Sequence, residues 1–146
     1  MGYWVDTIDV DVAVTGAKAR AALDALKQLH LDEDGGCRSF SWVDGDEAMR
    51  ALQGDGDPSE RLATVLGAWG YNADWKPEGV VSVVWRDLDK WGDDDALWPV
   101  LGPFVEPGLM TFRGEDGALF GYRFTGECAE ALRGVITWET EGGDNG

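Results

Sequence analysis

Two aromatic stretches separated by a turn lie near the C-terminus, and this pattern constrains the fold more than any other. Apolar residues alternate on both sides of the turn, as in strands with one buried face. They are Met110 and Phe112 before the turn, and Phe120, Tyr122 and Phe124 after it. Only a loop of odd length places both sets on one face, and a three-residue Glu-Asp-Gly loop does so by pairing Phe112 with Phe120. Gly117 supplies the left-handed residue that such a loop requires. The sequence therefore predicts an antiparallel β-hairpin, with Met110 opposite Tyr122.

Regular apolar spacing predicts a strand and two helices in the first half of the chain. Residues 7–14 alternate between polar and apolar, and the expected buried face consists of Ile8, Val10, Val12 and Val14. Residues 16–30 carry alanines and leucines at helical spacing. A second helix begins near Pro58, because Asp57 can cap it and proline suits its first turn. Gly70 ends it.

The stretch 80–85 is apolar on both alternating faces, which is typical of a central strand covered on each side. After it, Asp93–Asp95 would stand at a helix N-terminus, where free backbone N–H groups and the helix dipole favour carboxylates. Pro99 removes a backbone hydrogen bond from such a helix. The helix therefore either starts late or kinks, and the sequence leaves both alternatives open.

Weaker patterns complete the chain. They predict a short strand at 40–42, a helical turn within a loop at 46–52, a helical piece at 127–133, a last strand at 135–139 and a frayed tail at 141–146. With 44% hydrophobic residues, the chain has enough apolar material for one core. We expect residues 1–146 to form a single α+β domain, with an antiparallel or mixed sheet and helices packed mainly on one face.

The chain is strongly acidic, and its charge limits the classes of partner. It has 28 Asp and Glu against 12 Lys and Arg, which gives a net charge of −16. This charge repels DNA, RNA and anionic lipid, so we expect neither direct nucleic-acid binding nor membrane binding. A protein with a basic surface is the expected partner, although acidity also serves solubility alone.

Residue types that serve catalysis or metal binding elsewhere lack the necessary spacing here. His30 is the only histidine, and no nucleophile motif lies beside it. Three Asp-x-Asp pairs lack the later glycine and glutamate of a calcium-binding EF-hand loop. Cys37 and Cys128, with no export signal or membrane span, indicate reduced thiols and a cytoplasmic protein. We expect no cofactor, no metal and no catalytic residue.

Carboxylates and indoles concentrate in one segment, WRDLDKWGDDDALW. A metal site, an imitation of a phosphate backbone, a protein-binding patch and a helix entrance all use these residue types. The expected partner-binding residues are Trp85, Asp87, Asp89, Trp91, Asp93, Asp94 and Asp95. We expect Trp69 and Trp98 in the core, whereas Trp75, Trp85 and Trp91 flank loops where indoles can form a binding hot spot.

Five further segments together span most of the chain: MGYWVD, FSWVD, LATVLGAWGYNAD, LWPVLGPFV and FRGEDGALFGYRF. These segments resemble a family of small acidic proteins from bacteria, notably actinobacteria, and from phages. The most specific part is the apolar helix ending in PFV, followed by RGEDG and an aromatic strand. The family supplies no established activity and no catalytic residue. This chain departs from its aromatic pattern at Gly121 and Tyr122.

Three functional hypotheses follow from these observations. The first is a non-enzymatic cytoplasmic protein that binds another macromolecule through its acidic, Trp-bearing surface, and the phage resemblance adds a host-interaction or anti-defence role. The second is a DNA mimic that inhibits a basic nucleic-acid-binding protein, which requires carboxylates in a continuous stripe. The third is a hydrolase that depends on acidic residues or a metal.

Overall fold

Strand β1 (Tyr3–Val14) organises the sheet, because other strands pair along both of its sides. One side pairs with β3 (Val81–Arg86) and the two-residue β4 (Lys90–Trp91), and the other with β5 (Gly108–Gly114). The order is β2-β3-β1-β5-β6-β7, with β2 (Tyr71–Trp75) and β7 (Ala129–Gly134) at the edges and β6 (Leu119–Phe124) beside β7. Every strand pair is antiparallel in this computed structural model, which describes residues 3–31, 36–87 and 90–140.

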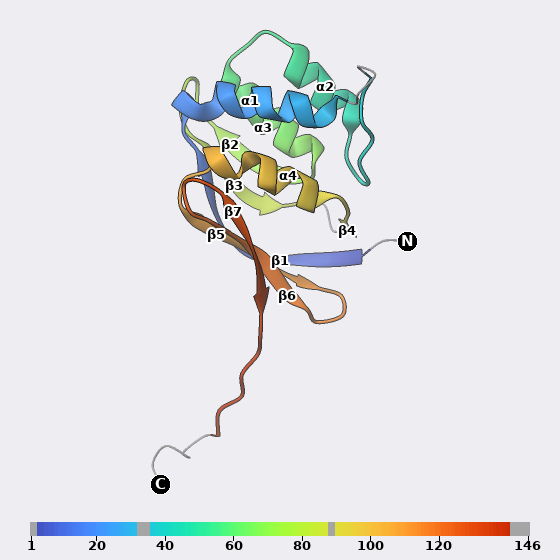
Figure 1. Cartoon of the computed structure of the whole chain (residues 1–146), viewed down its shortest axis with the longest axis vertical. Helices are drawn as coiled ribbons and strands as arrows, with labels where there is room; N and C mark the ends of the chain where they lie inside the picture. The colour runs from blue at the N-terminus through green and yellow to red at the C-terminus, as the bar shows by residue number, and fades with distance from the viewer. Residues whose placement is uncertain (1–2, 32–35, 88–89, 141–146) are drawn as a thin grey trace.

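The helices lie together on one side of the sheet (Figure 1). They are α1 (Gly16–His30), α2 (Gly45–Gln53), α3 (Pro58–Ala68), α4 (Asp94–Leu101) and the 3₁₀ turn η1 (Gly102–Phe104). Trp98 of α4 packs against Phe124 of β6, with ring centroids 5.6 Å apart. We call this side of the sheet the inner face and the opposite side the outer face. The predicted α+β architecture, with helices mainly on one face, is confirmed.

The C-terminal hairpin has the predicted register. Phe112 pairs with Phe120 and Met110 with Tyr122. Gly117 adopts a φ of +85°, and its backbone N–H donates to the Gly114 carbonyl at 2.9 Å. Because the loop has an odd number of residues, the aromatic residues of both strands lie on the inner face, as the alternation of apolar residues predicted.

The predicted buried face of β1 is wrong at Ile8, which is exposed. A β-bulge lies between Thr7 and Asp9, so Ile8 is the extra residue in the pairing with β5. Since a bulge shifts the alternation by one residue, odd positions such as Val5 are buried before it, and even positions such as Val12 are buried after it.

Strand β3 is central, but it is not covered on each side as predicted. Val81 and Val83 are buried, whereas Val84 and Trp85 are about half exposed. The pairing with β2 shifts between Asn72 and Ala73, which leaves Val84 as the extra residue of a second bulge. The apolar run thus reflects this bulge and an exposed outer face.

The helices at 16–30 and 58–68 follow their predicted limits. Asp57 caps α3 by accepting a hydrogen bond from the Ser59 N–H at 2.8 Å, and Trp69 is buried beyond the last turn. The region at 46–52 is more regular than predicted, because Asp44 caps the nine-residue helix α2. Helix α4 begins at Asp94 and continues through Pro99 to Leu101.

Three of the weaker predictions are wrong. Residues 127–133 are not helical, because Ala129–Gly134 pairs with β6 as strand β7. Residues 135–139 form no strand, since they have no strand partner within the described residues. Residues 40–42 form a turn in which Trp42 has a φ of +63°. The predicted frayed tail, 141–146, lies outside the described residues.

Candidate functional site

The segment predicted to bind a partner joins β3, β4 and the start of α4, and its centre is a buried ion pair. The Asp94 carboxylate lies 3.0 Å from Nε of Arg86, and both side chains are almost completely buried. Asp94 also accepts hydrogen bonds from Nη2 of Arg86 at 3.1 Å and from the Gly92 N–H at 3.3 Å. Asp94 therefore belongs to the interior and is not available to a partner.

Aromatic side chains enclose this pair. The Tyr71 hydroxyl donates to Asp94 and accepts from Nε1 of Trp98 at 3.0 Å. The Arg86 guanidinium lies 4.9 Å from the ring centroid of Trp91, and its Nη2 donates to the Lys90 carbonyl at 2.6 Å. Burial, followed by the Asp94 charge, raises the pKa of Tyr71 well above its usual value. The arrangement is a satisfied polar network that joins β2, β3, β4 and α4.

The neighbouring aspartates also contact other parts of the fold. The Asp93 carboxylate accepts a hydrogen bond from the Ser41 N–H at 2.7 Å, which holds the 41–42 turn. Asp95 accepts from the Tyr122 hydroxyl of β6. Partial burial, and then the charge of Asp94, raises the pKa of Asp95. These contacts indicate a structural role for Asp93, Asp94 and Asp95.

The remaining predicted residues separate into two groups. Trp91 is half-buried, with its ring centroid 5.0 Å from that of Phe112 and 4.9 Å from that of Phe120. Trp85, with 46% of its surface accessible, and Asp87 are exposed. Asp89 lies outside the described residues. Of the predicted patch, Trp85, Asp87 and Asp95 are thus exposed, although Asp95 also accepts a hydrogen bond from Tyr122.

Trp85 belongs to a surface whose residues from β1 and β2 were not predicted to lie near it. Ser82 of β3 pairs with Asp74 of β2 on one side and with Ala13 of β1 on the other, so these three strands share one outer face. Asp9, Asp11 and Asp74 are exposed, as is Val84 at the bulge. We call this surface, made of Trp85, Val84, Asp87, Asp74, Asp9 and Asp11, the outer acidic face.

A second group of exposed indoles lies near β4. The Lys90 ammonium is 5.0 Å from the ring centroid of Trp4 and 4.8 Å from that of Trp42. Both indoles are about half exposed. In the sequence, the exposure of Trp4 was indicated only by its position two residues before Asp6, which places both on the same, polar side of β1 before the bulge. Trp42 gave no comparable signal, because it lies in a turn.

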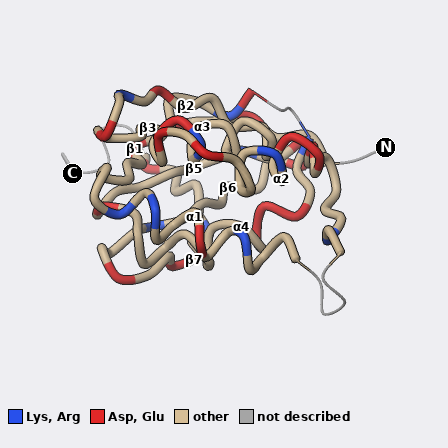
Figure 2. Tube along the Cα trace, turned by 90° about the horizontal axis from the view of Figure 1, so that it is seen from above, with Lys and Arg blue, Asp and Glu red and all other residues tan. Residues whose placement is uncertain are grey.

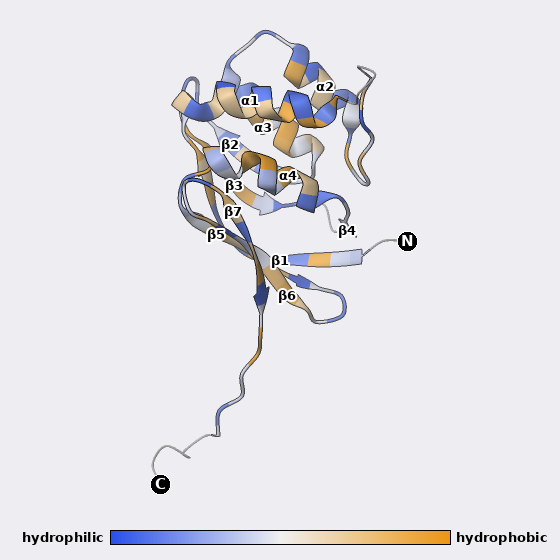
Figure 3. Cartoon of the chain, viewed as in Figure 1, coloured by the Kyte–Doolittle hydropathy of each residue, from blue (hydrophilic) through white to orange (hydrophobic). Residues whose placement is uncertain are grey.

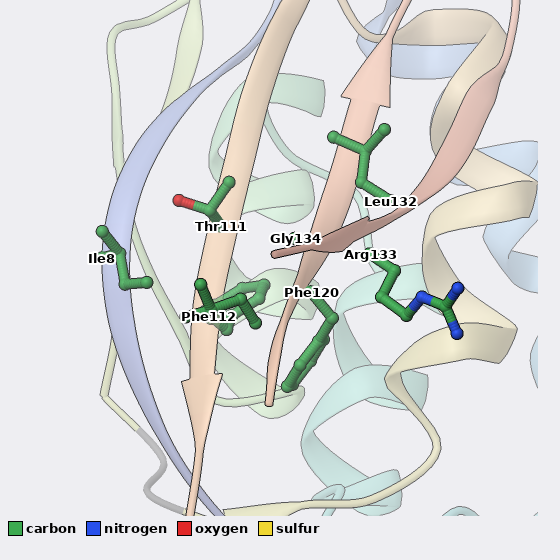
Figure 4. Close-up of a pocket in the computed structure, with 8 residues that line it drawn as sticks. Ile8, Thr111, Phe112, Phe120, Leu132, Arg133 and Gly134 are labelled. Carbon is green, nitrogen blue, oxygen red and sulfur yellow. The ribbon is translucent and has the colours of Figure 1, made fainter. Parts of the chain in front are cut away.

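An apolar groove of about 340 Å³ opens where β1, β5, β6 and β7 meet. Ile8 of β1 and Leu132 of β7 lie on either side of Thr111 of β5 (Figure 4). Leu119 and Gly134 complete this part of its lining. The groove has few polar groups to orient a small substrate, in contrast to a typical catalytic pocket.

His30, the histidine considered for catalysis, lies in the core. His30 is buried, and its Nε2 accepts a hydrogen bond from Nε1 of Trp69 at 3.0 Å. Burial lowers the pKa of His30, which favours the neutral imidazole. Among the described residues, His, Cys, Asp and Glu form no group of three or more that could hold a metal ion.

Acidic positions occur on several elements around the molecule, with basic positions between them (Figure 2). This distribution differs from the continuous stripe that imitation of a phosphate backbone requires. In the described part of the chain, no helix is both long and apolar enough to cross a membrane.

In comparisons with known proteins, no family model, curated protein or solved structure matches the chain. The resemblance to small acidic bacterial and phage proteins therefore stays a prediction.

Proposed function

We propose that this chain is a non-enzymatic cytoplasmic protein that binds another protein with a basic surface. The observation that carries the proposal is the outer acidic face, where the half-exposed Trp85 lies on a sheet surface that also carries Asp9, Asp11 and Asp74. The helices pack on the opposite side of the sheet (Figure 1). An exposed sheet surface with one indole anchor and several carboxylates suits a protein partner better than a small substrate.

The charges around Trp85 support a basic partner. Exposed carboxylates remain hydrated, so they attract a basic surface at long range and increase the rate of association. Trp85 provides apolar contact area, and tryptophan is among the residues that contribute most to binding energy at interfaces. The expected complex is therefore weakened by salt and depends on Trp85.

The proposed compartment agrees with the cysteines. Cys37 and Cys128 are both exposed and free, as expected where thiols are kept reduced. A role in phage–host interaction rests on the family resemblance alone and stays a prediction.

Affinity capture from a lysate of the source cells tests this proposal, with the chain immobilised and the washes made at low and high salt. The test variant combines Trp85→Ala with Asp87→Asn. The matched control combines Trp42→Ala with Asp55→Asn, because Trp42 is also 46% accessible and Asp55 is exposed.

We expect the wild type and the control to capture the same basic protein at low salt, and high salt to weaken the capture. The test variant should bind at least about tenfold more weakly, since a hot-spot residue contributes about 2 kcal/mol or more. Equal capture by the two variants would exclude the outer acidic face as the binding surface.

A further inference from the structure

Strand β7 is an edge strand that contains no bulge, lysine or proline. Its six residues pair with β6 in one unbroken register, and within the described residues its other side has no strand neighbour. The opposite edge, β2, differs because the bulge at Val84 of β3 interrupts its pairing and because Lys76 and Pro77 follow it. Bulges, lysine and proline commonly protect sheet edges. Beyond Ala129, whose backbone lies against Gly102 of η1, β7 is therefore the edge more open to another strand.

The chain continues from this edge into an exposed apolar segment. The segment 135–138 has the sequence Val-Ile-Thr-Trp, whose β-branched and aromatic residues favour strands. Val135 is 80% accessible, Ile136 60% and Trp138 90%. The segment leaves the domain in an extended path, and its first residues are hydrophobic (Figures 1 and 3). It has the composition of a strand but no strand partner among residues 3–31, 36–87 and 90–140.

The apolar groove lies beside the same edge. Leu132 and Gly134 of β7 line it together with Ile8, Thr111 and Leu119. Strand alternation places Ile136 and Trp138 on the same face as Leu132. The segment 135–138 runs away from the groove beyond Gly134, so it does not fill the groove of its own chain. In a second copy that runs antiparallel to the first, the same segment lies beside β7 and its groove.

We propose that residues 130–138 form an antiparallel interface with the same residues of a second copy of this chain. Every copy carries both the open edge and the unpaired segment, so a single two-fold axis satisfies both at once. The paired strands would join two sheets into one continuous sheet. The apolar side chains of each segment would then cover the edge of the other copy's groove.

The sequence favours one register for this interface. With Gly134 on the two-fold axis, Leu132 lies opposite Ile136 of the second copy. Arg133 then lies opposite Val135 of the second copy. Moving the axis to Arg133 would place two arginines opposite each other, and like charges in that position are destabilising. Moving it to Val135 would remove residues of β7 from the pairing. The register centred on Gly134 avoids both disadvantages.

The net charge of −16 opposes association of two copies, so salt should strengthen this interface by screening their repulsion. Salt should have the opposite effect on the basic partner proposed above. The two proposals use different surfaces, and the failure of one leaves the other intact.

Sedimentation equilibrium of the full chain tests the interface, from micromolar to about millimolar concentration, because a Kd of about 1 mM marks the weak limit of specific association. The test variant combines Ile136→Asp with Trp138→Asp. The control combines Val84→Asp with Trp42→Asp, which introduces the same two charges at half-exposed apolar positions elsewhere.

We expect a monomer–dimer equilibrium that tightens as salt increases. The test variant should weaken the dimer at least about tenfold, since each side chain loses the burial of a large apolar group. The control variant should dimerise as the wild type does. A chain that stays monomeric at all concentrations and salt levels would overturn the proposal, as would a dimer that both variants weaken equally or that the test variant leaves unchanged.

Discussion

Replacing Asp94 with alanine tests whether the buried network holds the β-sheet and α4 together. The substitution removes both oxygens that contact Arg86, while the Arg86 guanidinium stays buried under Trp91. A buried charge that loses its partner typically costs about 3–5 kcal/mol. This is a large part of the roughly 5–15 kcal/mol that stabilises a typical domain. For a chain of this length, the loss corresponds to a decrease in Tm of roughly 6–20 °C.

Urea unfolding, followed by tryptophan fluorescence, measures this loss as a change in midpoint at constant slope. Asp87→Ala is the matched control, because it removes the same charge at an exposed position, and it should change the free energy of unfolding by less than about 0.5 kcal/mol. Replacing both partners, with Arg86→Met and Asp94→Leu, should recover most of the loss, because no unpaired charge remains. A loss below about 1 kcal/mol for Asp94→Ala would refute the reasoning.

Three further predictions concern stability. His30→Gln should remove one component of the pH dependence: burial lowers the pKa of His30 below its unfolded value of 6.5, so its contribution to stability is complete above that pH and is lost as the pH falls. The difference in unfolding free energy between wild type and variant from pH 7 to 5 measures it, and a constant difference would contradict the assignment. Asp57→Ala should destabilise by about 0.5–2 kcal/mol in urea unfolding, because the carboxylate caps α3 and also accepts from the Glu78 N–H at 2.8 Å; no change would show that the cap is dispensable. Gly121→Ala should cost at least about 3 kcal/mol, because its Cβ would lie 2.0 Å from the Met110 carbonyl oxygen, whereas Gly117→Ala should cost only about 1–2 kcal/mol for its left-handed backbone. Thermal unfolding that ranked these two variants in the reverse order would contradict the packing at Gly121.

The hairpin and two helices were predictable because their determinants are local. The parity of the loop fixed the pairing of Phe112 with Phe120, and Asp57 marked the start of α3 by its capping chemistry. The two bulges were not predictable, since one extra residue reverses the face of its neighbours without a change in composition. Ile8 and Val84 are exposed for this reason.

The candidate site was harder to predict because burial of a charged residue depends on distant partners. Asp94 has the local sequence of a hydrated helix entrance, but Arg86 and Tyr71 bring it inside. Similarly, β6 determines that residues 129–134 form a strand, although their composition favoured a helix. Trp85 was predicted as a binding residue and is exposed, but the aspartates that share the outer face with it come from strands distant in the sequence.

Hydroxyl-radical footprinting of the chain, alone and with the captured basic protein, tests the proposed binding surface most directly. Trp85 and Trp42 are equally accessible in the chain, so mass spectrometry of their oxidation provides an internal comparison. Binding through the outer acidic face predicts that the partner slows oxidation of Trp85 and leaves that of Trp42 unchanged. Oxidation of Trp85 at the same rate in the complex, or protection of Trp42 alone, would contradict it.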